Sequence, residues 1–537
     1  MLSRYWLCLA VAGMALSQTG IDYLVVTPAR FAPAFADFAF WKTRKGLRTE
    51  VVPVETIMAR SSGRDRAEKV RNYLRLLHDS LGTSWVLLAG DTASVPTRMV
   101  FTPGNLTEYS PSDMYFSDLD GTWDEDHDNR FGEEEDSIDF FSDVYVGRVA
   151  AGDTETVRSL VEKWLEFERV PGPGFLMRLI RAGDTTQLVV PPGWFEGSIS
   201  SPPTTQELRD SLNVGYQLAW HLGHSDGQAL IVGGQVVLDI PGVQELTNRD
   251  KQCVLLTVGS QASAFDRQCI GSALVQHNQG GAVAVLANSR AGWTGISEIL
   301  GYQFFHNLFG SETCYEAGRN QARTKDRFVN LARTQWRWRQ ALYLWNLLGE
   351  PNLPLWKEEP RELTVTHPAT LDTGRQWFPI EVRSSGQPVR ARVCLWKGEE
   401  VFERRWVWDK ESIPIQPLTP GPMLVTVTAN NHLPYEGVCG IGVGIGQFPT
   451  SADRGPEVLV RGGRAVLVSS FCAVTVELFD QVGRRIDGPL RLMPGEQQRF
   501  VVLPGVVLVL ASHHGQAKAN CPAGDGDRSV TKAVVVR

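Results

Sequence analysis

The sequence predicts an α/β region built on a parallel sheet with helices on both faces, followed by two all-β modules. Two observations lead to this prediction. From residue 23 to about residue 355, short apolar, β-branched runs alternate with amphipathic helical stretches, which is typical of a parallel sheet covered on both faces. After Pro360, strand-like runs follow one another with turn residues between them and no helical stretch, as in β-sandwiches.

The first elements of the α/β region follow from hydrophobic periodicity. Strands are predicted at residues 23–26, 49–54 and 85–89, and helices at residues 34–44 and 66–80. In parallel sheets of this kind, ligands bind at the carboxyl ends of the strands. The chemistry of this region is therefore expected at that edge of the sheet.

The two all-β modules are expected at residues 360–445 and 455–537, after an α/β domain at residues 20–358. The strands predicted for the first module, an Ig-like β-sandwich, are residues 363–366, 377–382, 389–396 and 423–428. Those predicted for the second are residues 457–460, 465–468, 474–479, 499–502, 506–510 and 532–536.

Residues 1–17 have the pattern of a signal peptide. Arg4 supplies the positive charge, residues 6–15 the apolar stretch, and Ala15-Leu16-Ser17 a cleavage site of small residues. This apolar stretch is too short to cross a bilayer as a helix, and no later stretch is long enough. We expect export and no transmembrane span. The net charge of −7, without a basic cluster, argues against a nucleic-acid partner.

The chain contains eight cysteines, and Cys8 would leave with the signal peptide. An odd number remains, so at least one is unpaired or pairs elsewhere. Cys394 could pair with Cys439, and Cys472 with Cys521, since export permits disulfides. No Cys pair or His/Cys cluster has the spacing of a zinc site.

Three predicted strands end in residues that can carry acid–base or nucleophilic chemistry. The segments are LIRAGD, which ends at Asp184, QLAWHLGH, which ends at His224, and VLLTVGS, which ends at Ser260. An imidazole can take the proton of a nucleophile, and a carboxylate can orient that imidazole. The residues alone leave two interpretations open: a Ser/His/Asp site, or ordinary polar residues at loop entries.

Several further segments occur in a fixed order: the strand at residues 23–28, WKTRKGLRTEV at 41–51, WVLLAGD at 85–91 with Val95-Pro96, VYVGR at 144–148, and LGEPNL at 348–353. In order and spacing they resemble the gingipain-type cysteine peptidases of family C25, which have a caspase-like fold. The resemblance covers most of residues 23–356. It implies a peptidase domain that hydrolyses peptide bonds.

The resemblance assigns roles to the three strand ends. His224, in GHS, matches the catalytic histidine of the family's Gly-His-Gly motif, and Asp184 matches the acid that supports it. The family's nucleophilic cysteine lies five residues before a phenylalanine, and counting back from Phe265 gives Ser260. Serine therefore stands at the position of the nucleophilic thiol.

Two further positions follow from the same resemblance. Ser225 replaces the glycine whose backbone N–H resembles half of the family's oxyanion hole, where glycine frees the backbone. Trp293 resembles an aromatic residue that lines the family's substrate pocket, although a tryptophan packed in the core is an equal alternative.

A serine hydroxyl must lose its proton in concert with attack, so it needs a more closely placed base than a thiol does. We therefore expect a peptidase-family protein with impaired hydrolysis and no cofactor required for chemistry. Three alternatives stay open: a serine-based hydrolase, a non-catalytic binding or scaffold protein at the cell surface, and a displaced thiol, Cys253 or Cys269. The partner would be a polypeptide substrate or a protein ligand.

An acidic loop at residues 118–135 predicts a structural Ca²⁺ site, because Ca²⁺ takes six to eight oxygen ligands. The candidate ligands are Asp118, Asp120, Asp124, Asp126, Asp128 and Glu133. A solvated acidic loop is the alternative.

The last module carries a second resemblance. The strand at residues 474–480 runs into the turn QVGRR at 481–485, and strands at 506–510 and 532–537 follow. This pattern is similar to the C-terminal sorting domain of type IX secretion. It implies secretion machinery as a partner, and a secreted location or one on the outer cell surface of a bacterium.

Overall fold

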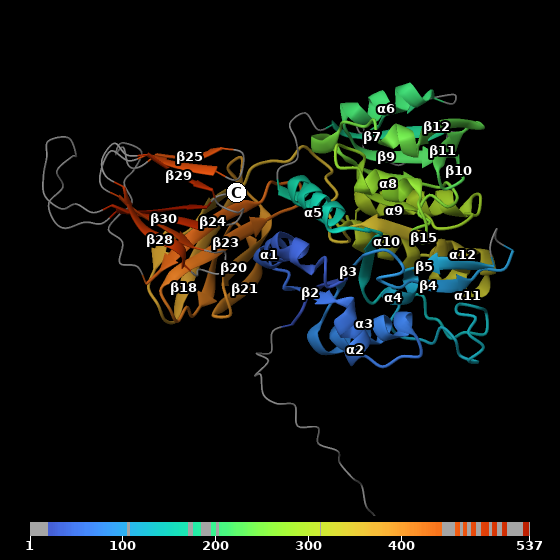
Figure 1. The fold of residues 1–537 in the computed structure, drawn as a ribbon, viewed down its shortest axis with the longest axis horizontal. Helices are drawn as coiled ribbons and strands as arrows, with labels where there is room; N and C mark the ends of the chain where they lie inside the picture. The colour runs from blue at the N-terminus through green and yellow to red at the C-terminus, as the bar shows by residue number, and fades with distance from the viewer. Residues whose placement is uncertain are drawn as a thin grey trace, which may run out of the picture.

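The computed structural model describes residues 20–104, 108–169, 203–311 and 313–442 in full, and the backbone of strands within residues 176–199 and 457–535 (Figure 1). A ten-stranded sheet forms the centre of the α/β region, in the order β2-β1-β3-β6-β15-β14-β13-β9-β7-β8. Its strands are β1 (Tyr23–Thr27), β2 (Thr49–Pro53), β3 (Trp85–Ala89), β6 (Tyr145–Val149), β7 (Leu176–Gly183), β8 (Phe195–Ile199), β9 (Tyr216–Leu222), β13 (Cys253–Thr257), β14 (Ala282–Asn288) and β15 (Trp345–Gly349). Every residue of β1, β3, β13, β14 and β15 is buried, as the continuous apolar runs predict for a sheet covered on both faces.

One strand departs from the purely parallel sheet that the sequence predicts. β15 pairs antiparallel with β14, with Asn288 opposite Trp345. The reason is that β15 follows α12 (Trp336–Leu344) directly, and Trp336 on that helix packs against Trp293 in the loop after β14. The chain therefore enters the sheet from the edge at which β14 ends.

Helices cover the sheet in two groups. One group contains α1, α5 and α8, which contact one another, and the other contains α9, α10 and α12. The helices are η1 (Ala32–Phe35), α1 (Ala36–Arg44), α2 (Val54–Arg60), α3 (Arg66–Leu81), α4 (Met114–Ser117), α5 (Thr154–Arg169), α6 (Thr205–Val214), α7 (Ile240–Val243), η2 (Arg249–Lys251), α8 (Ile270–Gln276), α9 (Ile296–Phe309), α10 (Ala317–Asp326), α11 (Val329–Thr334) and α12. A short hairpin, β4 (Arg98–Phe101) and β5 (Tyr109–Ser112), lies outside the large sheet.

Local chemistry sets the ends of these helices. The predicted helix at residues 66–80 is α3, and Asp65 caps its start by accepting a hydrogen bond from the Glu68 N–H at 2.9 Å. Gly82 ends it with φ of 74°, a left-handed conformation that glycine adopts without strain. The predicted helix at residues 34–44 is α1, extended at its start by η1.

The region after Pro360 contains only strands among the described residues. They are β16 (Thr364–Thr366), β17 (Thr370–Leu371), β18 (Gln376–Ser384), β19 (Gln387–Pro388), β20 (Arg390–Lys397), β21 (Val401–Trp408), β22 (Lys410–Ile415), β23 (Gly421–Thr428) and β24 (Tyr435–Ile441). They form two sheets, one of β16, β18, β19 and β22 and the other in the order β17-β24-β23-β20-β21. Buried apolar residues of both sheets, among them Phe378, Val393 and Val425, form one core.

A second set of strands lies near the carboxyl end of the chain. They are β25 (Glu457–Arg461), β26 (Ala465–Ser469), β27 (Val474–Phe479), β28 (Arg485–Leu492), β29 (Gln497–Val501), β30 (Val507–Ser512) and β31 (Val530–Val535). They form a sheet in the order β25-β26-β29 and another in the order β28-β27-β30-β31.

The two sulfur atoms proposed to bridge in the first sandwich are not bonded. Cys394 and Cys439 are both free and buried, because β23 lies between their strands in the sheet. The other suggested pair, Cys472 and Cys521, lies outside the described residues, as do residues 1–17 and Asp184. In the part of the chain that the structure describes, no helix has the length and apolar character of a membrane span.

Candidate functional site

The three predicted strand ends come from neighbouring strands. β13 pairs in parallel with β9, with Thr257 opposite His221, and β9 pairs in parallel with β7, with Gly183 opposite Leu222. The carboxyl ends of parallel neighbours meet at one edge. The segments that begin at residues 184, 223 and 258 therefore leave the sheet side by side.

His224 lies on a hairpin that follows β9. This His224 hairpin, residues 222–239, contains β10 (His224–Ser225), β11 (Ala229–Val232) and β12 (Gln235–Asp239) in one antiparallel sheet. Side chains alternate along β10, so that His224 is exposed and Ser225 is buried. The Ser225 hydroxyl accepts a hydrogen bond from the Gly227 N–H at 3.1 Å.

The His224 hairpin touches the Ser260 loop, residues 258–266. A methyl group built on Gly259 would lie 2.7 Å from the Ser225 Cβ and 3.3 Å from the His224 carbonyl carbon. On the other side of Ser260, a methyl group on Gly227 would lie 3.3 Å from the Gln261 Cβ. Both loops therefore meet on either side of Ser260, and glycines allow the close approach.

The Ser260 loop is also fastened to the loop that follows β14. The Ser260 hydroxyl oxygen accepts a hydrogen bond from the Gly292 N–H at 3.3 Å. Gln261 has φ of 62°, and its N–H donates to the Arg290 carbonyl at 3.0 Å. The Arg290 guanidinium pairs with both carboxylate oxygens of Asp266 at 2.9 and 2.6 Å. A left-handed non-glycine residue beside a candidate nucleophile is strain of the kind that gathers at functional sites.

The Ser260 and His224 side chains are close in the fold without being bonded to each other. Among the described residues, no hydrogen bond joins them, and Gly292 supplies the donor to the Ser260 hydroxyl. Asp184 directly follows β7 and is the third predicted member, outside the described residues.

A second histidine, His221, was not predicted to take part. We expected the strand to end at Trp220, but β9 continues to Leu222 and buries His221. Its Nδ1 lies 2.7 Å from the Thr257 hydroxyl, which also accepts a hydrogen bond from the Gly259 N–H at 2.9 Å. Its Nε2 lies 3.2 Å from the Ile231 carbonyl.

Burial lowers the pKa of His221 to about 4, so its ring is neutral near pH 7. Nε2–H must donate to the Ile231 carbonyl, which leaves Nδ1 to accept from the Thr257 hydroxyl. This chain of hydrogen bonds links the Ser260 loop, β9 and the His224 hairpin. The possible signal in the sequence is the period-two position of His221 in β9, which points it into the protein.

Trp293 lies next to the same site. It directly follows Gly292 in the chain, and its side chain is half-buried. The indole Nε1 donates to Gln340 Oε1 at 3.2 Å, and the ring packs edge-on against Trp336 at 5.0 Å. The structure therefore places Trp293 on a loop that contacts Ser260, with one edge held by α12.

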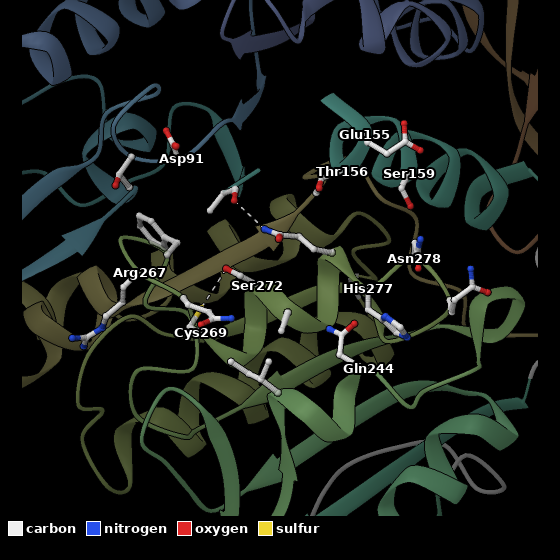
Figure 2. Close-up of a pocket in the computed structure, with 18 of the residues that line it drawn as sticks. Asp91, Glu155, Thr156, Ser159, Gln244, Arg267, Cys269, Ser272, His277 and Asn278 are labelled. Atoms are coloured by element: carbon white, nitrogen blue, oxygen red, sulfur yellow. Dashed lines mark hydrogen bonds between the residues drawn. The ribbon is translucent and has the colours of Figure 1, made fainter. Parts of the chain in front are cut away.

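The alternative thiols occupy other positions. Cys253 is the first residue of β13, at the opposite end of the strand from Ser260, and burial raises its pKa to about 12. Cys269 lies against a groove of about 800 Å³ between α5 and α8 (Figure 2). Its thiol donates to the Ser272 hydroxyl at 3.3 Å, and burial raises its pKa. Neither thiol is ionised near pH 7, as a reactive cysteine must be.

The acidic loop brings together three of its six predicted ligands. Carboxylate oxygens of Asp124, Asp126 and Asp128 lie within 4.8 Å of one another. Such an oxygen cluster fits a hard cation such as Ca²⁺, although Arg64 also pairs with Asp124.

The other three predicted ligands have different surroundings. The buried Asp118 carboxylate accepts a hydrogen bond from the Phe140 N–H at 3.1 Å, and burial raises its pKa to about 8. Asp120 is exposed, and its N–H donates to Asp143. Burial, followed by the neighbouring Asp128, raises the pKa of Glu133, which places Glu133 beside the three-carboxylate cluster.

This fold, with histidine- and serine-bearing loops in contact at the carboxyl edge of the sheet, defines a caspase-like α/β protein of the peptidase type. Residues 16–356 match the family model described as peptidase family C25, and the chain belongs to that family.

Among characterised relatives, gingipain R2 of Porphyromonas gingivalis strain W83 is 21% identical over 521 residues, which cover 89% of this chain and 65% of the relative. Lys-gingipain W83 of Porphyromonas gingivalis is 22% identical over 463 residues, which cover 78% of this chain and 25% of the relative. The chain therefore spans less than two thirds of the length of these relatives.

Solved structures give the same fold. The Arg-specific cysteine proteinase gingipain R superposes with a TM-score of 0.63 at 18% identity, covering 79% of this chain and 99% of that one. The complex of the Porphyromonas gingivalis RgpB pro- and mature domains superposes with a TM-score of 0.64, also at 18% identity, covering 78% of this chain and 100% of that one.

Proposed function

We propose that this chain is an exported bacterial member of the gingipain-type peptidases in which peptide-bond hydrolysis is impaired, because Ser260 stands where the family has its nucleophilic cysteine. Family membership supports the reaction class. The environment of Ser260 supports the impairment.

The observation that carries the proposal is the hydrogen bonding of Ser260. Its hydroxyl accepts from the Gly292 N–H at 3.3 Å and has no hydrogen bond to His224 within the described residues. A serine nucleophile needs a base about 2.6–3.2 Å away to take its proton. A thiol depends less on this contact, because it ionises near pH 8.5 without help. The arrangement therefore suits a thiolate better than an alkoxide.

The proposed roles follow the geometry. His224 accepts the proton of the nucleophile, and Asp184 orients His224. The backbone N–H groups near Ser225 and Ser260 hold the oxyanion. Trp293 forms one wall of the pocket for a polypeptide substrate or protein ligand.

Three further assignments belong to the same proposal. Residues 1–17 direct export, and residues 455–537 serve as a type IX sorting module that places the protein outside the cell or on its outer surface. Ca²⁺ held by Asp124, Asp126 and Asp128 stabilises the acidic loop and takes no part in the chemistry.

Labelling of the full chain tests the impairment. We expect a fluorophosphonate probe, which reacts with activated serines, to leave Ser260 unlabelled when tryptic peptides are mapped by mass spectrometry. In Ser260→Cys, iodoacetamide should alkylate the introduced thiol at pH 6.5 at least tenfold faster than in Ser260→Cys/His224→Ala. Cys269→Ser in the same background is the matched control and should not change that rate.

Each outcome discriminates. Fluorophosphonate labelling of Ser260 would identify a working serine hydrolase and contradict the proposed impairment. Equal alkylation rates with and without His224 would show that the imidazole does not serve position 260, and would leave the non-catalytic binding or scaffold protein as the better assignment.

A further inference from the structure

A small cavity lies between the α/β region and the first β-sandwich, away from the Ser260 loop. Its volume is about 130 Å³. The lining comes from α1 and the loop after it, from the loop after β15, and from the facing strands β20 and β21 (Figure 1). The two regions are held together around it, for example by Arg44 and Glu436 at 2.8 Å.

Two buried polar atoms of this lining have no hydrogen-bond partner in the described part of the chain. They are Asn352 Oδ1 and His432 Nε2, on side chains that are only 6% and 8% exposed. His432 Nδ1 lies 2.8 Å from the Asn430 carbonyl, so it carries the proton. Burial lowers the pKa of His432, which keeps the ring neutral and leaves Nε2 as a bare acceptor. Buried polar atoms are normally satisfied, so both acceptors require a donor from outside the chain.

The charged groups of the cavity already have partners. Lys45 Nζ lies 2.8 Å from Glu168 Oε2, and the Arg392 guanidinium donates to the Gly46 carbonyl at 2.6 Å. The missing element is therefore a hydrogen-bond donor, not a counter-charge. A neutral hydroxyl-bearing ligand meets that need, whereas an ion does not.

An aromatic surface continues from the mouth of the cavity along β21. Trp406 lines the cavity and is 55% exposed, and Trp408, two residues further on, is 64% exposed. Alternate residues of a strand share a face and lie roughly 6.6 Å apart. The Arg390 guanidinium lies 4.9 Å from the Trp406 ring centre. Exposed indole rings are unusual on a protein surface and mark contact sites.

We propose that this cavity binds the end of a neutral oligosaccharide. Hydroxyl groups of the terminal sugar donate to Asn352 Oδ1 and His432 Nε2, and the C–H faces of the following sugar rings stack on Trp406 and Trp408. A peptide fits less well, because it brings one carbonyl acceptor for every N–H donor, while both unpartnered atoms of the lining are acceptors.

Isothermal titration of the full chain with maltohexaose, cellohexaose and chitohexaose tests the proposal. We expect saturable binding of at least one sugar, and Trp406→Ala should raise its Kd at least tenfold. The matched control is Trp377→Ala, since Trp377 is also 64% exposed but lies on β18 outside the cavity. It should change the Kd less than twofold.

Asn352→Ala separates a binding role from a structural one. Because Oδ1 has no partner inside the protein, we expect the variant to melt no lower than the parent without sugar, while its Kd rises about tenfold. Failure of all three sugars to bind would overturn the proposal and leave a water-filled cavity. Equal effects of Trp377→Ala and Trp406→Ala, or a lower melting temperature of Asn352→Ala, would also overturn it.

Discussion

A single methyl group at Gly259 tests the apposition of the Ser260 loop and the His224 hairpin. In Gly259→Ala the new Cβ would lie 2.7 Å from the Ser225 Cβ, 3.0 Å from the Thr257 hydroxyl and 3.3 Å from the His224 carbonyl carbon. Carbon atoms pack best at about 3.5–4.0 Å, so the hairpin must retreat by about 1 Å. Overpacking of this kind costs about 1–3 kcal/mol.

The expected change in melting temperature follows from the size of the domain. With an unfolding entropy of about 2.1 cal/mol/K per residue over about 340 residues, 1 kcal/mol corresponds to about 1.4 °C, so the variant should melt about 1–4 °C lower. In the Ser260→Cys background, the retreat of His224 should also move the apparent pKa of the introduced thiol toward about 8.5, the value of an unperturbed cysteine. The pH profile of iodoacetamide alkylation measures this.

The matched control is Gly152→Ala, because Gly152 is exposed and a Cβ there meets no atom within 4 Å. It should leave both the melting temperature and the alkylation profile unchanged. If Gly259→Ala gives the same profile as its parent, the two loops are not in contact and the assigned site is wrong.

Three further predictions concern stability. Lys42→Met strips the buried Glu168 and Glu350 carboxylates of their shared cation and should cost about 3–5 kcal/mol, part of which Lys42→Met/Glu350→Gln recovers; an unchanged calorimetric melting temperature would contradict this network. Burial raises the pKa of Asp326 from 3.8 to about 7, so its contribution to stability is fully present below pH 3.8 and is lost as pH rises through 7. Asp326→Asn should therefore melt higher than the parent at pH 8 but not at pH 4, and a pH-independent difference would refute the shift. Adding 5 mM Ca²⁺ should raise the melting temperature of the parent and not of Asp126→Asn, and equal responses would remove Asp126 as a ligand.

Strands with one kind of environment could be read from the sequence, and strands with two could not. β1 and β3 are buried throughout, so their continuous apolar runs predict them to within one residue. β21 was missed because Trp406 and Arg404 point outward among charged neighbours. Arg404 there contacts the Gly46 carbonyl and Asp22 of the α/β region, and no local pattern encodes a contact across about 360 residues of chain.

The same difference explains the candidate site. The order of the strand ends predicts that His224 and Ser260 share an edge, since parallel neighbours place their carboxyl ends together. The role of His221 depends on Thr257 and Ile231, which reach it only through strand pairing and the His224 hairpin. The helical spacing assumed for Trp336, Trp338 and Trp345 is wrong for the same reason: Trp345 starts β15 and is buried by the sheet on either side.

The bonds that shape the Ser260 loop do not involve the atom that would attack a substrate. The loop is held by Gln261 N–H on the Arg290 carbonyl, by the Asp266–Arg290 pair and by Gly259 N–H on Thr257. A hydroxyl at position 260 even gains a bond from the Gly292 N–H, which a thiol, a weak acceptor, would make less well. The proposed replacement of a thiol by Ser260 thus removes reactivity while leaving the loop in place. For this reason Ser260→Cys should meet a preformed site, and its reactivity reports on chemistry and not on refolding of the loop.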